Sequence, residues 1–176
     1  LQKNNVREGV LRIAVSRAGG SRGYLPLDSE CAPFLVIEVM ALPESVREHH
    51  VVIAHTRKIS PVALPVGVKL AQGVNSMLAR MEAQEQGATE AIMLNEQGHL
   101  CEASSATLFW RKGAKLYTPA LSCGLVKGIM RQLIMAHWQG GVVEVEESVE
   151  TLLDADAVMV ANAVVGAVAV QSLTVP

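Results

Sequence analysis

Short runs of aliphatic residues, separated by turn-forming residues, dominate the chain and predict a strand-rich protein. The runs are rich in β-branched residues and partly alternate with polar positions, as strands do. The expected strands cover residues 10–16, 34–40, 51–55, 90–94, 107–110, 115–117, 142–145, 158–160 and 168–170. A glycine-rich segment at 17–24 and a hairpin turn at 95–98 separate neighbouring strands.

Residues 74–86 and 128–138 instead show the spacing of helices, and a shorter helix is expected within 149–153. Gly87 follows the first segment, where a left-handed C-cap is common. The helically spaced apolar residues are Met77, Leu78 and Met81 in the first segment, and Ile129, Leu133 and Ala136 in the second. Together these elements predict an α+β fold with a curled, largely antiparallel sheet and two main helices on its outside.

Composition and charge narrow the class of protein. Half of the 176 residues are hydrophobic and 18% are charged, which suits one ordinary domain or two small lobes and excludes a disordered chain. A net charge of -2 argues against a nucleic-acid partner. No apolar run approaches the ~20 residues of a membrane span. Three cysteines without a CxxC pair favour a reducing cytoplasm.

Several common catalytic motifs do not occur in the sequence, among them GxGxxG, GxxxxGK and HExxH. Residues 19–23 read GxSxG, but they fall in the glycine-rich turn between two predicted strands and do not form a nucleophile elbow. His49, His50 and His55 lie close together in the sequence, but no cluster of carboxylates or cysteines accompanies them. Metal sites usually need such additional ligands. We therefore expect ordinary strand histidines and no metal.

Lys69 is the first candidate for chemistry. It lies between Val68 and Leu70, after an irregular segment at 58–67 that contains two prolines. A lysine desolvated by apolar neighbours has a lowered pKa and serves as a nucleophile or forms a Schiff base. The alternative is a surface lysine whose ammonium reaches solvent. Taken without other evidence, the position of Lys69 favours this alternative.

Glu102 is the second candidate, within residues 101–106, which we expect to form a loop of small residues between two strands. A carboxylate there is suited to pair with a protonated ring nitrogen, as a pyridoxal cofactor requires. As an isolated feature it is more often a turn residue. Ser104 and Ser105 either donate hydrogen bonds to the same ligand or satisfy the turn.

A third feature is the loop at 124–131, which leads into the second predicted helix. The free amides of Ile129 and Met130 at the helix start suit a phosphate group, because the N–H groups and the helix dipole act together. A plain loop with glycines for flexibility is the alternative. Asn162, at the end of a predicted strand, either contacts the same anion or bonds to its own turn.

With these residues, the sequence resembles the fold-type IV family of pyridoxal-phosphate enzymes. The resemblance runs from about residue 9 to 173 and is strongest in GATEAIMLNEQGHLCEASSATLFWRKGAKLYTPAL and GLVKGIMRQ. The family includes branched-chain and D-amino-acid aminotransferases and aminodeoxychorismate lyases. The stretches SRAGGSRGY, ATLFWRKG and GIMRQ, and the asparagine of ANAVVGAVAV, resemble the lyases more than the aminotransferases.

The resemblance implies a role for each candidate and pyridoxal 5'-phosphate as cofactor. Lys69 matches the lysine that holds the cofactor as a Schiff base, and Glu102 matches the glutamate bonded to the pyridine nitrogen. The remaining matches lie around the cofactor: the backbone amides of Ile129 and Met130 under the phosphate, Asn162 on its other flank, and Ser104 and Ser105 in the adjacent loop.

The resemblance also implies the reaction, in which 4-amino-4-deoxychorismate is converted to 4-aminobenzoate and pyruvate in folate biosynthesis. An aminotransferase for D- or branched-chain amino acids is one alternative, and a non-catalytic truncated remnant that binds a partner is another. Family members are usually homodimers, so a cytoplasmic homodimer is expected.

The implied fold is D-amino-acid aminotransferase-like, with two parts. Residues 1–43 would be the C-terminal part of a small N-terminal lobe, and residues 44–176 the large cofactor-binding domain. Residues 1–8 are polar and match nothing in the family's N-terminal segment. We therefore expect either a processed tail or the later part of a longer chain, with an incomplete N-terminal lobe.

Overall fold

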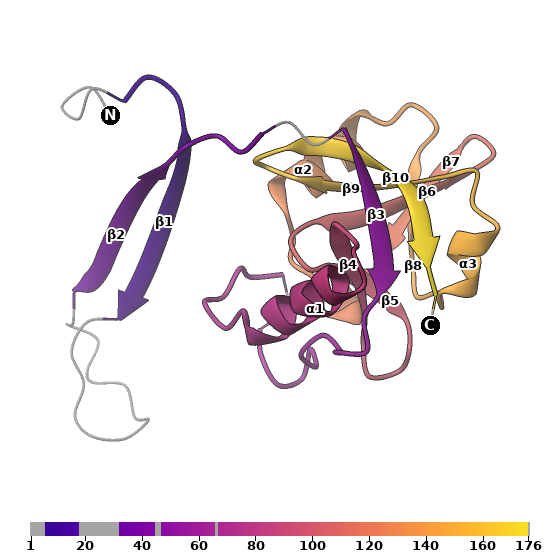
Figure 1. The fold of residues 1–176 in the computed structure, drawn as a ribbon, viewed down its shortest axis with the longest axis horizontal. Coiled ribbons are helices and arrows are strands. Elements are labelled where there is room, and N and C mark those ends of the chain that lie inside the picture. Colours follow the sequence, from indigo (N-terminus) through magenta and orange to yellow (C-terminus); the bar gives the residue numbers. More distant parts are fainter. Residues whose placement is uncertain (1–5, 18–31, 45–46, 66, 176) are drawn as a thin grey trace. The chain divides into compact units, whose positions relative to one another are not determined.

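The computed structural model describes residues 6–17, 32–44, 47–65 and 67–175. The chain divides into two compact units, Leu1–Glu44 and Ser45–Pro176. The first unit contains β1 (Val10–Arg17) and β2 (Pro33–Met40), which pair antiparallel along their whole length (Figure 1). Their apolar side chains are largely exposed. The glycine-rich turn expected at 17–24 lies, apart from Arg17, outside the described residues.

The second unit holds a mixed sheet in the order β5-β4-β3-β10-β9-β6-β7-β8. Its strands are β3 (Glu48–Ile53), β4 (Glu90–Leu94), β5 (Leu100–Ala103), β6 (Thr107–Lys112), β7 (Lys115–Pro119), β8 (Val142–Val145), β9 (Ala157–Asn162) and β10 (Gly166–Thr174). Among the described residues, four neighbouring pairs in this sheet are antiparallel and three are parallel. The antiparallel majority agrees with the sequence pattern.

Three α-helices and a 3-10 turn complete the described part of this unit. They are α1 (Val74–Glu85), α2 (Ile129–His137), α3 (Glu150–Leu153) and the turn η2 (Leu121–Cys123). α1 packs on β4 and α2 on β9 (Figure 1). Gly87 follows the C-cap residue Gln86 of α1 and has φ +69°, as expected of a left-handed residue at a helix end. None of the described helices is long and apolar enough to cross a membrane.

Alternation along the strands separates an inner core from two outer layers, because successive side chains point to opposite faces. The inner core holds Val51, Ile53, Ile92, Leu94, Leu108, Trp110 and Val160. On the opposite face, α1 contributes Ala79 and Ala83 against β3 and β4, and α2 contributes Met130 and Ile134 against β6 and β9. The sheet therefore curls around one core with α1 and α2 outside, which confirms the predicted architecture.

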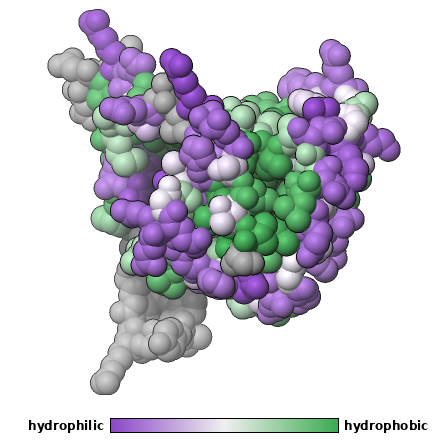
Figure 2. All heavy atoms as spheres, turned by 45° about the vertical axis from the view of Figure 1, so that its right-hand side comes forward, coloured by the Kyte–Doolittle hydropathy of each residue, from purple (hydrophilic) through white to green (hydrophobic). Residues whose placement is uncertain are grey.

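The helices were predicted correctly, but the apolar faces that indicated them are not their buried faces. Met77, Leu78 and Met81 are each more than 40% exposed, and α1 is buried through its small alanines. Ile129, Leu133 and Ala136 are likewise exposed on α2. Alanines let the helix approach the sheet closely and leave the larger residues outside. Figure 2 shows hydrophobic side chains gathered on one face of the molecule, bordered by hydrophilic ones.

The loop expected at 101–106 is only partly a loop. Leu100–Ala103 form the strand β5, which pairs antiparallel with β4 and is buried along its whole length. Burial on both faces removes the alternation that marks a half-exposed strand, so the pattern did not predict it. Glu102 consequently lies on a strand, which fixes its backbone more firmly than a loop would.

Candidate active site

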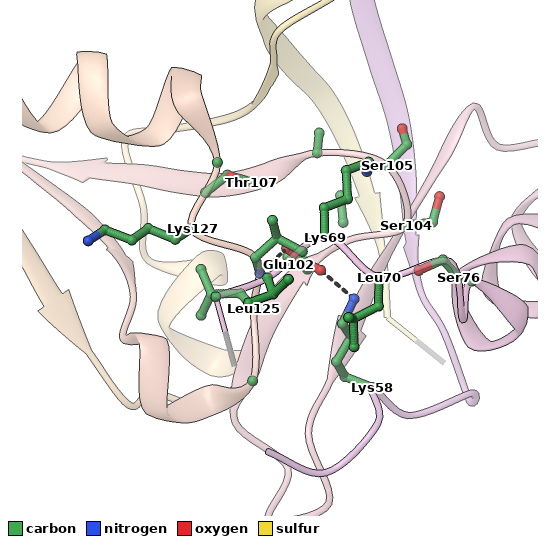
Figure 3. A pocket seen from close by; sticks show the side chains of 18 of the residues that line it. Lys58, Lys69, Leu70, Ser76, Glu102, Ser104, Ser105, Thr107, Leu125 and Lys127 are labelled. Carbon is green, nitrogen blue, oxygen red and sulfur yellow. Dashed lines mark hydrogen bonds and ion pairs between the residues drawn. The ribbon is translucent and has the colours of Figure 1, made fainter. Parts of the chain in front are cut away.

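A pocket of about 620 Å³ lies within the second unit (Figure 3). Its walls come from the segment between β3 and α1, the turn after β5, the loop before α2 and the turn after β9. The volume lies in the range of small-ligand and cofactor sites. All seven residues singled out in the sequence line it, namely Lys69, Glu102, Ser104, Ser105, Ile129, Met130 and Asn162.

A short backbone bridge brings the first and third walls together. Gly67 donates its N–H to the carbonyl of Leu125 at 3.2 Å and accepts the N–H of Lys127 at 3.1 Å. Gly67 has φ +76°, a conformation that side-chain-bearing residues rarely adopt. The bridge holds Lys69, two residues further along, beside the loop that leads into α2.

Lys69 is exposed to the open pocket. Val68 before it is 53% exposed, so the structure does not enclose the lysine between apolar neighbours as its local sequence suggested. Its side chain makes no hydrogen bond or ion pair with the described residues. The amine is therefore available to a ligand in the pocket.

Glu102 is buried, and both of its carboxylate oxygens are engaged. Lys58 donates to Oε1, and the backbone N–H of Val126 donates to Oε2 at 3.0 Å (Figure 3). These contacts hold the carboxylate in one orientation in the pocket wall. A carboxylate oxygen has more than one acceptor position, so Glu102 can still accept a hydrogen bond from a ligand.

The N-terminus of α2 opens onto the pocket without a side-chain cap. Gly128 occupies the N-cap position, with φ -65° and ψ 149°, and no side-chain cap bond is made there by the residues that the structure describes. The N–H groups of Ile129 and Met130 belong to the first turn, which has no partners within the helix. A pocket lined by such free donors suits an anionic group.

The turn after β5 is tied to Glu90, a buried residue behind it. Ser104 and Ser105 both donate their hydroxyl protons to the carboxylate of Glu90, the latter at 2.6 Å. These contacts agree with the alternative in which the serines satisfy the turn, and a contact with the cofactor stays a prediction. Their hydroxyls are engaged by the protein itself.

Asn162 ends β9 and connects two turns of the pocket wall. Its Oδ1 accepts the N–H groups of Val164 and Val165 at 2.9 and 3.0 Å, and its Nδ2 donates to the carbonyl of Ser105 at 3.3 Å. The bonds from Val164 and Val165 are those of the second role considered for Asn162, in which it bonds to its own turn. Asn162 still lies among the residues that line the pocket.

Among the described residues, four with ionisable side chains line the pocket: Lys58, Lys69, Lys127 and Glu102. Three ammonium groups and one carboxylate make its charge positive. Lys127 extends away from the middle of the pocket (Figure 3). The pocket therefore favours an anionic ligand.

Two of the three histidines, His49 and His50, lie on β3 and make ordinary side-chain hydrogen bonds. His49 Nδ1 lies 3.0 Å from Thr89 Oγ1, and His50 Nδ1 lies 2.8 Å from Ser172 Oγ. Burial lowers the pKa of His49. In the part of the chain that the structure describes, no group of three or more His, Cys, Asp or Glu side chains is placed to hold a metal ion.

Sequence reasoning missed Lys58 and Glu90. Lys58 contacts Glu102 across 44 positions, and no local pattern around it indicates that partner. Glu90 carried a usable signal: it begins the apolar run EAIML, where a buried carboxylate requires a specific partner.

Comparison with known proteins defines the class. The family model for amino-transferase class IV matches residues 1–173, so the chain belongs to the class IV aminotransferase family.

Two of the proteins that the chain is similar to are named aminodeoxychorismate lyase. The chain is 33% identical over 175 residues to aminodeoxychorismate lyase of Vibrio harveyi. The matched residues cover 94% of this chain and 64% of that protein. It is 26% identical over 170 residues to aminodeoxychorismate lyase of Bacillus subtilis, covering 93% of this chain and 58% of that protein. The chain thus spans about three fifths of the length of these relatives.

The fold is also found among solved structures. The branched-chain amino acid aminotransferase of Thermobaculum terrenum in its PLP form matches with a TM-score of 0.85 at 21% identity, over 98% of this chain and 58% of that one. This likeness establishes the fold-type IV architecture that the sequence predicted.

Proposed function

We propose that the chain binds pyridoxal 5'-phosphate in this pocket and that the whole protein is a lyase. Its substrate would be 4-amino-4-deoxychorismate, and its products 4-aminobenzoate and pyruvate. One observation carries the proposal: an available amine, a fixed carboxylate and an uncapped helix N-terminus line the same pocket. Relatives named as lyases support the reaction class.

The residues present fit the cofactor. Lys69 offers an amine for its aldehyde, Glu102 a carboxylate for its ring nitrogen, and the first turn of α2 offers N–H donors for its phosphate. The positive charge of the pocket suits both a phosphate and a substrate carboxylate. The T. terrenum relative is itself in a PLP form.

In the proposed reaction, each residue has a distinct task. When bound, the cofactor supplies an electron sink for the substrate carbon that bears nitrogen. Lys69 would hold the cofactor, and its amine would accept the proton from that carbon. Glu102 would keep a proton on the ring nitrogen, and the first turn of α2 would bind the phosphate. Loss of pyruvate leaves an aromatic ring, which drives the step forward.

An aminotransferase acting on D- or branched-chain amino acids is the second candidate, because the family and the T. terrenum likeness include that activity. The two candidates differ in their need for a second substrate. A lyase releases pyruvate from aminodeoxychorismate alone, whereas an aminotransferase requires an added keto acid to complete its cycle. Pyruvate release with and without a keto acid separates them.

Borohydride reduction followed by peptide mass spectrometry tests the cofactor site. We expect a pyridoxyl group on Lys69, and none after Lys69→Ala. Lys127→Ala is the matched control, because Lys127 lines the same pocket, and it should leave the Lys69 adduct unchanged. A folded protein without any adduct would favour the remnant that binds only a partner, and full turnover in Lys69→Ala would contradict the assignment.

We also propose that the protein is a homodimer in the cytoplasm. The exposed apolar residues of α1 and α2 support an interface, since large exposed apolar patches often mark one. Light scattering of the purified protein tests the dimer: the mass of a monomer at micromolar concentration would contradict it.

A further inference from the structure

The carboxylate of Glu90 joins both serines of the pocket turn to the sheet behind it. Ser104 donates to Oε1 and Ser105 to Oε2, so each oxygen accepts one hydroxyl proton. The backbone N–H of Ala91 adds a third hydrogen bond, to Oε1 at 2.8 Å. Glu90 is 2% exposed and is not among the residues that line the pocket. It therefore acts on the pocket only through other groups.

The charge of Glu90 makes this arrangement demanding. A buried carboxylate is costly unless hydrogen bonds or an opposite charge compensate it. Among the described residues, the guanidinium of Arg80 forms an ion pair with Glu90, 3.8 Å from Oε1, and its side chain is half exposed. An exposed partner at that distance contributes little. The two serine hydroxyls and one amide thus supply most of the compensation, and the turn cannot move without removing it.

The constraint extends beyond the serines. The N–H of Ser104 donates to the carbonyl of Ala91 at 2.8 Å, which ties the turn to β4 a second time. The carbonyl of Ser105 accepts the amide of Asn162 at 3.3 Å. A continuous hydrogen-bonded path therefore runs from Glu90 through Ser105 to Asn162, along one wall of the pocket.

We propose that Glu90 is a positioning residue for the cofactor site. It holds the turn of Ser104 and Ser105, and through that turn Asn162, in the arrangement that receives pyridoxal 5'-phosphate. The inference rests on the proposed function. The serine hydroxyls donate to Glu90 in this arrangement, so the serines would act on the cofactor through the position of the turn.

Three variants test this link: Glu90→Gln, the pair Ser104→Ala with Ser105→Ala, and the combination of all three changes. A glutamine offers one acceptor oxygen in place of two and no charge, so both hydroxyls cannot donate to it as before. We expect Glu90→Gln and the serine pair each to raise the Kd for pyridoxal 5'-phosphate about tenfold. The triple variant should be no weaker than Glu90→Gln alone, because the changes act through one connection.

Glu146→Gln is the matched control. Glu146 accepts the hydroxyl of Ser122, but neither residue lines the pocket. Its Kd should equal that of the unmodified protein. A second readout needs no cofactor: amide hydrogen exchange of the peptides that contain residues 104–106 and 162–165 should be faster in Glu90→Gln and unchanged in Glu146→Gln.

The Kd is measured below the urea concentration at which each variant begins to unfold, so that loss of folded protein is not counted as weak binding. An unchanged Kd in folded Glu90→Gln would overturn the inference and leave the proposed function standing. Additive effects in the triple variant would also overturn it, since the serines would then contact the cofactor independently. If Glu90→Gln does not fold, the double variant Ser104→Ala with Ser105→Ala decides: an unchanged Kd for pyridoxal 5'-phosphate in that variant would also overturn the inference. Failure of the unmodified protein to bind the cofactor would overturn both.

Discussion

Lys58 and Glu102 form an ion pair in the wall of the pocket, and the carboxylate is held from its other side by the N–H of Val126. Their side chains are only 16% and 8% exposed. Removing one member of such a pair leaves the other poorly solvated and without compensation. The pair therefore couples the stability of the second unit to the orientation of the proposed partner of the pyridine nitrogen.

Lys58→Met should lower the free energy of unfolding by about 2 kcal/mol, because Glu102 then loses a charged hydrogen-bond donor. Lys58→Met combined with Glu102→Gln should recover part of that loss, since no unpaired charge remains. Urea denaturation measures both effects. Lys112→Met is the control, because its pair with Asp154 is largely exposed and should contribute under 1 kcal/mol. Equal losses for Lys58→Met and Lys112→Met would contradict the prediction.

The sequence predicted the architecture better than it predicted the packing. Aliphatic runs located most strands, and helical spacing located α1 and α2, because both signals are local. The same spacing did not show which helix face is buried. In α1 the close approach of the sheet selects Ala79 and Ala83, and the larger Met77 and Met81 remain outside. That choice depends on tertiary contacts that a periodicity does not contain.

In the candidate site, too, the sequence indicated the residues but not the tertiary contacts that hold them. Resemblance to the family gathered Lys69, Glu102 and Asn162, and the structure brings them to one pocket. The network that holds them could not be predicted, because it joins residues far apart in the chain. Glu102 contacts Lys58 across 44 positions, and Ser105 contacts Asn162 across 57. Their functional roles stay predictions that the experiments above address.

Gly128→Asp should weaken cofactor binding while stabilising the protein without cofactor. The backbone of Gly128 has ordinary N-cap dihedral angles, so a carboxylate there can accept the free N–H groups of α2. It would then occupy the proposed phosphate donors and repel the phosphate. Relative to Gly128→Ala, we expect about 1 kcal/mol more stability in urea and at least a tenfold higher Kd for pyridoxal 5'-phosphate in equilibrium dialysis.

Gly128→Ala is the appropriate reference, because a Cβ at this position meets Thr107 Oγ1 at 3.3 Å in both variants. The comparison therefore cancels the small displacement of Thr107. If the two variants bind the cofactor equally well, its phosphate does not lie at the start of α2.

Cys101 and Cys123 should resist alkylation in the folded protein. Burial raises the pKa of both thiols, and the charge of Glu102 raises that of Cys101 further. Since the thiolate is the reactive species, iodoacetamide at about pH 8 should modify neither residue until the protein unfolds. Peptide mass spectrometry with and without urea measures this. Modification of Cys101 at the same rate in both conditions would show that the cluster of Cys101, Cys123 and Leu125 is open to solvent.

His49 should make the protein less stable as the pH falls below neutrality. Burial lowers the pKa of His49 from 6.5, although the nearby Glu90 partly opposes this shift. As the pH falls through 6.5, the unfolded chain takes up a proton at this position while the folded protein does not. The unfolded state then binds more protons, so stability rises with pH across this range and is lost as the pH falls toward the lowered pKa of the folded state.

Urea denaturation at about pH 7.5 and about pH 5.5 measures this effect. The free energy of unfolding should differ less between the two pH values for His49→Gln than for the unmodified protein. His137→Gln, at the exposed end of α2, should retain the full difference. An undiminished pH dependence in His49→Gln would mean that another group is responsible.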